Sequence, residues 1–145
     1  MKEYRIYTAG RMNGTTLEEQ LKWRIDLKYE LSRLCDEPFL VLNPPMYYNY
    51  ETKSHKSEHE VREWELAQLE QCDIMVVNLK DVEKSVGAIT EIATAIAINN
   101  HTDRHIYIIG VGDESGLHPW IKDSIFRFEP DINSAATYIS EYLFL

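Results

Sequence analysis

The sequence predicts a single α/β domain in which a parallel sheet of about five strands is covered by helices on both faces. Two observations lead to this expectation. Short apolar segments with the length of buried strands alternate along the chain with longer segments of helical periodicity. The length of 145 residues suits one domain with one core, so we take residues 1–145 as that domain.

Five segments carry the pattern of strands. Each is a short run dominated by β-branched, aromatic and other apolar residues, a composition typical of strands buried in a sheet. The runs are YRIYTA (4–9), FLVL (39–42), DIMVVNL (73–79), HIYIIGV (105–111) and SIFRF (124–128).

Four helices fit between and after these strands. Three are expected over residues 58–71, 86–100 and 132–142. The fourth, which comes first in the chain between strands 4–9 and 39–42, has an apolar stripe on one side of its helical wheel. This stripe is formed by Leu17, Leu21, Leu27, Leu31, Leu34 and Cys35. The resulting β-α-β-α-β-α-β-β-α order, with right-handed crossovers, predicts a flavodoxin-like or Rossmann-like three-layer sandwich.

Ligands of such sheets bind beyond the carboxyl ends of the strands, where the strand order reverses, usually beside strands one and three. We therefore expect the site within residues 8–16, 43–57, 78–91 and 110–120. The tyrosine-rich loop 43–57 is interpreted as an adaptable wall for a stacked base, with a dimer contact or a flap as alternatives.

Charge and cysteine content exclude several classes of function. The net charge of −9 disfavours a nucleic-acid polymer as a partner, because that binding needs clustered lysine and arginine. No apolar run approaches the roughly 20 residues that cross a bilayer, and the first residues lack the apolar core of a signal peptide. We therefore expect a cytoplasmic protein without a membrane partner. Cys35 and Cys72 lack metal-ligand spacing and are expected to be core thiols.

Glu91 is the most informative single residue, because it is the only charged side chain between Lys84 and Asp103, inside an otherwise apolar helix. A capping box does not explain it, since a helix capped by Ser85 would need the glutamate at position 88. It is either a surface glutamate on the wet edge of the helix or a carboxylate at the ligand crevice. In the second case it suits chemistry at an anomeric carbon, as in retaining glycosidases.

Glu65 is the second unusual carboxylate, because it falls on the inward stripe of its helix, with Val61 and Leu69. One interpretation is that its headgroup extends to the helix edge or pairs with a lysine. If it reaches the crevice, burial would raise its pKa, as a general acid for a leaving base requires.

Two turns contain candidate substrate contacts. Gly10 and Arg11 belong to the glycine-containing turn after the first strand, whose N–H groups either face an anion or ribose or simply form the corner. Ser85 and Gly87 open the third helix, which suits a 5′-phosphate or 5′-hydroxyl, although Ser85 also serves as a plain N-cap.

Four further candidates lie at strand ends. Tyr7 belongs either to the sheet core or to the crevice against Glu91, and Asn78 ends the third strand. His118 and Trp120 follow the fourth strand, where a structural corner and a binding role are both open.

With these residues in view, the chain resembles the nucleoside 2-deoxyribosyltransferase superfamily, which also contains deoxynucleoside 5′-monophosphate N-glycosidases. The resemblance covers most of the chain as ordered motifs: IYTAGRMNG (6–14), WELAQLEQCDIMVVNL (64–79) and DVEKSVGAITEI (81–92). The last is similar to the family's Ser-x-Gly-x-x-x-Glu motif.

The resemblance implies a role for each matching residue. Glu91 takes the place of the nucleophile, Tyr7 of the tyrosine that holds it, and Ser85 of the contact with the 5′ end of the substrate. Glu65 stands where the family usually has an aspartate that protonates the base. A homo-oligomer, dimer or larger, is also implied, with 110–121 or the last helix completing a neighbour's site.

The expected function is cleavage of a deoxynucleoside or its 5′-monophosphate and transfer of the deoxyribosyl group to another nucleobase, with water as the alternative acceptor. No metal or organic cofactor is expected. A non-catalytic flavin or nucleotide-binding module is the other hypothesis. A phosphoacceptor signalling domain is excluded, because it needs acidic residues where this chain has Thr8-Ala9 and Asn78-Leu79.

Overall fold

The computed structural model describes residues 2–46 and 55–144 and contains a five-stranded, all-parallel sheet. The strands are β1 (Tyr4–Ala9), β2 (Phe39–Leu42), β3 (Ile74–Asn78), β4 (Tyr107–Val111) and β5 (Arg127–Glu129). Their spatial order is β2-β1-β3-β4-β5, the flavodoxin-like order, with its reversal point between β1 and β3. The predicted fold class is confirmed.

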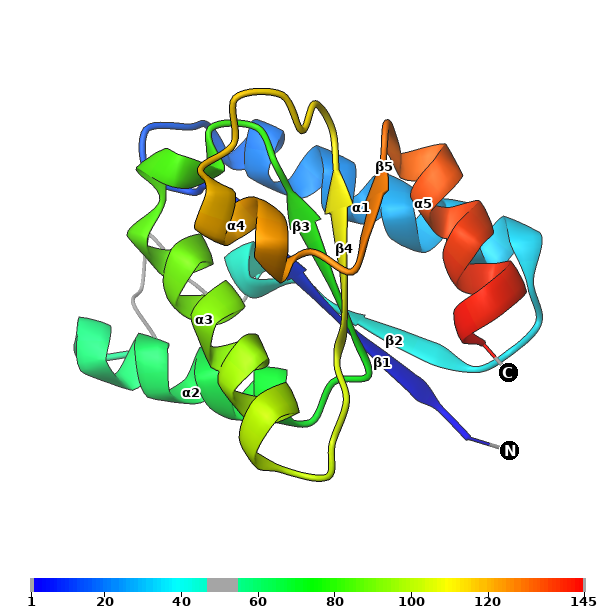
Figure 1. The fold of residues 1–145 in the computed structure, drawn as a ribbon, viewed down its shortest axis with the longest axis horizontal. Helices are drawn as coiled ribbons and strands as arrows, with labels where there is room; N and C mark the ends of the chain where they lie inside the picture. The colour runs from blue at the N-terminus through cyan, green and yellow to red at the C-terminus, as the bar shows by residue number, and fades with distance from the viewer. Residues whose placement is uncertain (1, 47–54, 145) are drawn as a thin grey trace.

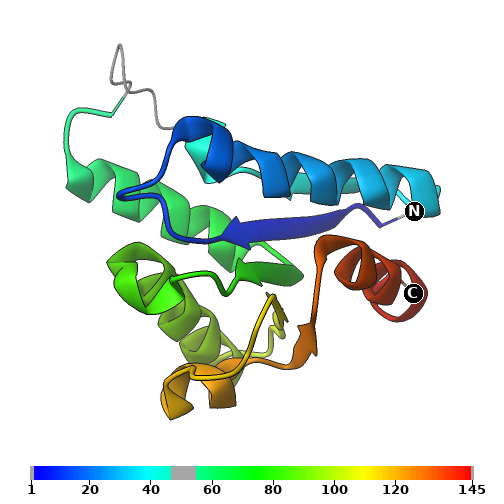
Figure 2. The same ribbon diagram turned by 90° about the horizontal axis from the view of Figure 1, so that it is seen from above.

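Helices cover both faces of this sheet (Figures 1 and 2). The helices α1 (Leu17–Leu34) and α5 (Ile132–Tyr138) pack against each other on one face, and a π-helical turn, Ile139–Leu143, extends α5. The helices α2 (Glu58–Glu70), α3 (Val86–His101) and α4 (Pro119–Ser124) lie on the other face. Each face has its own hydrophobic cluster.

The short helix α4 corrects the predicted element order. Parallel strands need a crossover connection, and α4 supplies it between β4 and β5, where the sequence pattern indicated no helix. Six residues are too few to show helical periodicity, although Pro119 at its start is a favourable first residue. The strand β5 also begins at Arg127, three residues later than expected.

The buried face of α1 also differs from the predicted apolar stripe. Leu17 and Leu34, at the two ends, are 47% and 36% exposed, whereas Arg24 is only 1% exposed. The buried residues of the helix are Gln20, Arg24, Leu27 and Leu31, so two polar side chains share its inward face with two leucines. Cys72 is buried as predicted, while Cys35 is partly buried, and both are free thiols.

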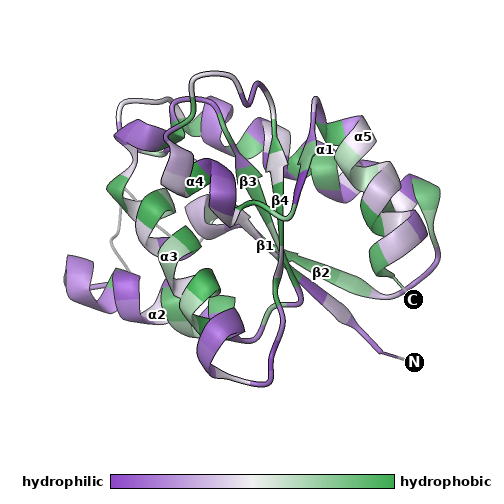
Figure 3. Cartoon of the chain, in the orientation of Figure 1, coloured by the Kyte–Doolittle hydropathy of each residue, from purple (hydrophilic) through white to green (hydrophobic). Residues whose placement is uncertain are grey.

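The two helices that carry Glu65 and Glu91 differ in hydropathy. In Figure 3, α3 is largely hydrophobic, whereas the N-terminal end of α2 is hydrophilic. These two helices pack against each other on the face that contains Glu91 and Glu65. None of the helices among the described residues is long and apolar enough to cross a membrane.

Candidate active site

Tyr7 and Glu91 form a buried pair at the carboxyl end of the sheet. Tyr7 comes from the buried strand β1 and is 0% exposed, and Glu91 comes from the second turn of α3 and is 8% exposed. The Tyr7 hydroxyl donates a hydrogen bond to Glu91 Oε2. The structure thus excludes a surface position for Glu91 and brings together two residues that are 84 positions apart in the chain.

Burial dominates the electrostatics of this pair. It raises the pKa of the Glu91 carboxyl to about 8, the neighbouring Glu65 adds to the rise, and the Tyr7 hydrogen bond and the Arg24 charge oppose it. Burial, followed by the charge of Glu91, raises the pKa of the Tyr7 hydroxyl far above its ordinary range. Tyr7 therefore stays protonated and acts as a donor.

Glu65 extends from α2 toward the same space and is partly buried. Burial raises the pKa of its carboxyl to about 7, against the opposing charge of Arg24, and Glu58 on the same helix adds a smaller rise. A carboxyl that titrates near neutrality can give up a proton at physiological pH, which is a requirement for a general acid.

A cavity of about 610 Å³ connects these groups and falls within the size range of small-molecule sites. Glu65, Glu91 and the loop after β1 all contribute to its lining. The complete lining is Gly10, Met12, Asn13, Gly14, Thr15, Leu17, Gln20, Glu58, Val61, Glu65, Ser85, Gly87, Ala88 and Glu91. Among residues 2–46 and 55–144, no group of three His, Cys, Asp or Glu side chains is placed to hold a metal ion.

The N-terminus of α3 opens into the cavity through Ser85 and Gly87. The Ser85 side chain is buried and accepts a hydrogen bond of 3.1 Å from the Ala88 amide, so it is a true N-cap. A Cβ atom on Gly87 would meet no heavy atom within 4 Å, so the space beside this first turn is open. The positive end of a 16-residue helix dipole therefore faces the cavity.

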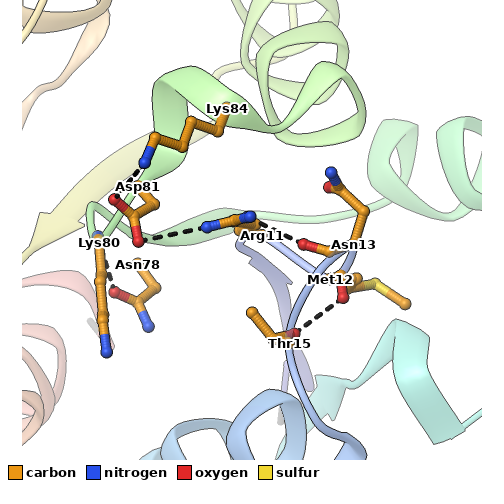
Figure 4. Close-up of polar contacts among 8 residues, drawn as sticks. All are labelled: Arg11, Met12, Asn13, Thr15, Asn78, Lys80, Asp81 and Lys84. Atoms are coloured by element: carbon orange, nitrogen blue, oxygen red, sulfur yellow. Dashed lines mark hydrogen bonds and ion pairs between the residues drawn. The ribbon is translucent and has the colours of Figure 1, made fainter.

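Gly10 and Arg11 are neighbours in the turn after β1, but only Gly10 lines the cavity. Gly10 lines the cavity, and a Cβ there would lie 3.0 Å from the Trp23 ring and 3.2 Å from Asn78 Cβ, so a larger residue would fit only if these neighbours moved by a few tenths of an ångström. Arg11 is not among the lining residues, and its side chain extends toward Asp81, at 3.3 Å (Figure 4).

Arg11 and Asn78 form hydrogen bonds to backbone groups in the loops that follow β1 and β3. The Arg11 Nε donates to the Asn13 carbonyl at 2.9 Å, and Asn78 Oδ1 accepts from the Lys80 amide at 3.1 Å (Figure 4). Both line a separate hollow of about 380 Å³, which also contains Trp23. Neither is among the residues that line the cavity of Glu91.

His118 and Trp120 also lie outside that cavity within one chain. Trp120 is 82% exposed, and the His118 ring accepts a 3.1 Å hydrogen bond from the Trp120 amide as the N-cap of α4. The His118 amide donates to Glu83. Of the predicted loop wall 43–57, residues 47–54 lie outside the described residues.

Of two further polar residues in this region, Arg24 was absent from the predicted site, and Asn43 was covered by the predicted range 43–57 without being singled out. Arg24 is spaced by three and seven residues from Leu27 and Leu31, so its position on the inward stripe was visible in the sequence pattern. Asn43, directly after β2, is 7% exposed, and its Oδ1 has no hydrogen-bond partner among the described residues. Such an acceptor is costly to leave unpaired.

Comparisons with known proteins agree with this architecture. A family model described as nucleoside 2-deoxyribosyltransferase like matches residues 3–108. A crystal structure of a conserved protein from Enterococcus faecalis V583 superposes with a TM-score of 0.73 at 14% identity, covering 95% of this chain and 98% of that one. At this identity, the second likeness concerns the fold alone. A search among curated proteins gave no match.

Proposed function

This chain belongs to the nucleoside 2-deoxyribosyltransferase-like family, and from that premise we propose that it transfers a 2-deoxyribosyl group between nucleobases. The donor is a 2′-deoxynucleoside or its 5′-monophosphate. The observation that carries the proposal is the buried hydrogen-bonded pair of Tyr7 and Glu91 beside a cavity of about 610 Å³.

Glu91 acts as the nucleophile in the first step. In the fraction of molecules in which Glu91 has lost its proton while Glu65 keeps its own, the Glu91 carboxylate attacks C1′ of the sugar, the N-glycosidic bond breaks, and the bonding electrons leave with the base. Tyr7 orients the carboxylate through its hydrogen bond. The missing 2-hydroxyl of a deoxyribose makes positive charge at C1′ easier to form, so a modest site suffices.

Glu65 supplies the proton that the departing base needs. Its carboxyl lines the same cavity and keeps its proton up to a pH of about 7, because burial raises its pKa. The covalent intermediate then reacts with a nitrogen of a second base at C1′, and Glu91 is released as a carboxylate. Proton transfer back to Glu65 completes the cycle.

Hydrolysis is the second candidate, and the open N-terminus of α3 favours it. Ser85, the Gly87 backbone and the helix dipole form a neutral to positive end of the cavity that suits a 5′-phosphate. In the sequence resemblance, serine at this position is typical of the monophosphate hydrolases. In that case, water takes the place of the acceptor base.

The test is base release from a panel of deoxynucleosides and their 5′-monophosphates, followed by chromatography with and without a second base. The variant Glu91→Gln keeps the side-chain shape and removes the anion, so we expect a loss of about a thousand-fold or more. The matched control is Glu70→Gln, which changes an exposed glutamate of α2 and should leave turnover unchanged.

Each outcome has a defined meaning. A new nucleoside formed only with the acceptor present supports transfer, and free base alone supports the hydrolase. Full activity of Glu91→Gln would refute its role as nucleophile. Absence of turnover with every substrate would favour a non-catalytic nucleotide or flavin-binding module, and a yellow purified protein would point to flavin.

We also propose a cytoplasmic homo-oligomer, dimer or larger, in which residues 110–121 complete the site of a neighbouring subunit. The exposure of Trp120 supports this proposal, since its side chain is available to a second copy. Sedimentation equilibrium tests it, with Trp120→Ala expected to weaken both assembly and substrate binding. A fully active monomer would contradict it.

A further inference from the structure

The Arg11 side chain is folded against its own loop, which follows β1. Its Nε donates to the Asn13 carbonyl at 2.9 Å, and a Cβ atom on Gly14 would lie only 2.6 Å from Arg11 Nη2. Gly14 also has a φ of +74°, a conformation that favours glycine. The guanidinium therefore occupies the space that a side chain at position 14 would need, and it packs against the turn that residues 11–14 form.

The same guanidinium reaches the loop that follows β3. Its Nη1 lies 3.3 Å from Asp81 Oδ2 (Figure 4). Asp81 has a φ of +51°, a left-handed conformation that aspartate and asparagine adopt more readily than most residues other than glycine. It precedes the short 3-10 turn Val82–Lys84, which leads directly to Ser85, the N-cap of α3. Arg11 thus connects the loop after β1 with the segment that positions the N-terminus of α3.

The two segments that Arg11 connects both line the cavity of Glu91. Residues 12–15 come from the loop after β1, and Ser85 and Gly87 come from the start of α3. Residues 12–15 belong to no helix or strand, so their position depends on a few polar contacts.

On the side of α1, the loop is held by the Met12 carbonyl, which accepts from Thr15 Oγ1 and from Gln20 Nε2, both at 2.8 Å. On the side of β3, the contact is the Arg11–Asp81 ion pair. Neither Arg11 nor Asp81 lines the cavity. The pair is therefore placed to act on the position of the loop and not on the substrate itself.

We propose that Arg11 is a positioning residue, which holds residues 12–15 at a fixed distance from the N-terminus of α3 and so sets the width of the substrate cavity. The order that Arg11 gives to the loop follows from its contacts with Asn13, Gly14 and Asp81. The consequence for substrate binding rests on the proposed function.

Backbone ¹⁵N relaxation measures the order of this loop without any substrate. In wild type, the amides of residues 12–15 should have order parameters of about 0.85, and in Arg11→Met these should fall to about 0.6 or below. Asp81→Asn removes the ion pair, tolerates the same φ and leaves the bond from Arg11 Nε to Asn13, so intermediate values are expected. The matched control is Lys84→Met, which removes the other cation beside Asp81, 3.7 Å from its Oδ1, and should leave the loop unchanged.

Order parameters equal to those of wild type in a folded Arg11→Met would overturn the proposal. If that variant does not fold, Asp81→Asn decides, because the Asp81 side chain is 41% exposed and its replacement leaves the core untouched. An unchanged loop in Asp81→Asn would then overturn the proposal in the same way.

The link to turnover is read from KM and kcat measured separately. A loosened wall weakens the binding of substrate and transition state alike, and Arg11 contacts neither Tyr7 nor Glu91. In Arg11→Met, KM should therefore rise by roughly tenfold, with kcat within about twofold of wild type. Asp81→Asn should also raise KM, by about threefold.

Two results would refute this link. If Arg11 bound the substrate itself, Asp81→Asn would free the guanidinium and lower KM. A purely structural role would lower the amount of folded enzyme, and thus the apparent kcat, without changing KM. An inactive wild-type enzyme would refute the proposed function, and the relaxation measurement would still decide whether Arg11 orders the loop.

Discussion

Replacement of Glu91 by glutamine should change how the stability of the protein depends on pH. In the folded protein, burial raises the pKa of this carboxyl from its ordinary value of 4.5 to about 8. The folded state therefore holds a proton that the unfolded chain has already lost. Glutamine keeps the shape and the acceptor for Tyr7 but cannot ionise, so the variant lacks this linkage.

The sign and the size follow from the two pKa values. The raised pKa of Glu91 adds to the free energy of unfolding. This addition is fully present below about pH 4.5 and is lost progressively as the pH rises toward about 8. Each pKa unit corresponds to roughly 1.36 kcal/mol, so the shift from 4.5 to about 8 corresponds to about 5 kcal/mol of the free energy of unfolding. That is a large part of the roughly 5–15 kcal/mol that stabilises an ordinary domain.

Urea unfolding of both proteins at about pH 4.5 and about pH 9 measures the effect. With a urea dependence of about 2 kcal/mol per molar, the midpoint of wild type should fall by up to about 2.5 M relative to that of Glu91→Gln. Glu70→Gln, which changes an exposed side chain, should follow wild type at both pH values. Parallel curves for wild type and Glu91→Gln would refute the burial argument.

Three other predictions concern the contacts around the cavity. Tyr7→Phe removes a hydrogen bond that lowers the pKa of the Glu91 carboxyl, so activity should fall by roughly ten- to a hundred-fold and the pH–rate profile should move to higher pH. Gly10→Ala should destabilise the fold by about 1–3 kcal/mol in urea unfolding, because its Cβ would lie 3.0 Å from the Trp23 ring. A double-mutant cycle on Arg11 and Asp81 should give a coupling below about 1 kcal/mol, since the two side chains are 23% and 41% exposed.

Each of these has a clear contrary result. An unaltered rate in Tyr7→Phe would make this tyrosine a core residue only. Wild-type stability in Gly10→Ala would show that the Trp23 ring moves aside freely. A coupling of several kcal/mol between Arg11 and Asp81 would mean that the pair is more buried in solution than in the structure.

The sequence by itself determined the strands, the longer helices and their order. Local chemistry decides these features, because apolar runs of strand length and helical periodicity are readable from neighbouring residues. The position of Glu91 in the apolar helix 86–101 and of Glu65 on an inward stripe were visible in the same way. The short helix α4 was missed, because six residues hold no readable period.

Only the tertiary structure decided which side chains meet. Tyr7 and Glu91 contact each other across 84 positions, the Arg11 side chain extends toward Asp81, and Arg24 occupies the core beside Thr8. A periodic pattern tells which face of an element a residue occupies, but it does not tell how a long side chain leaves that face. That direction depends on charges and space supplied by elements distant in the chain, which exist only once the sheet and helices have packed.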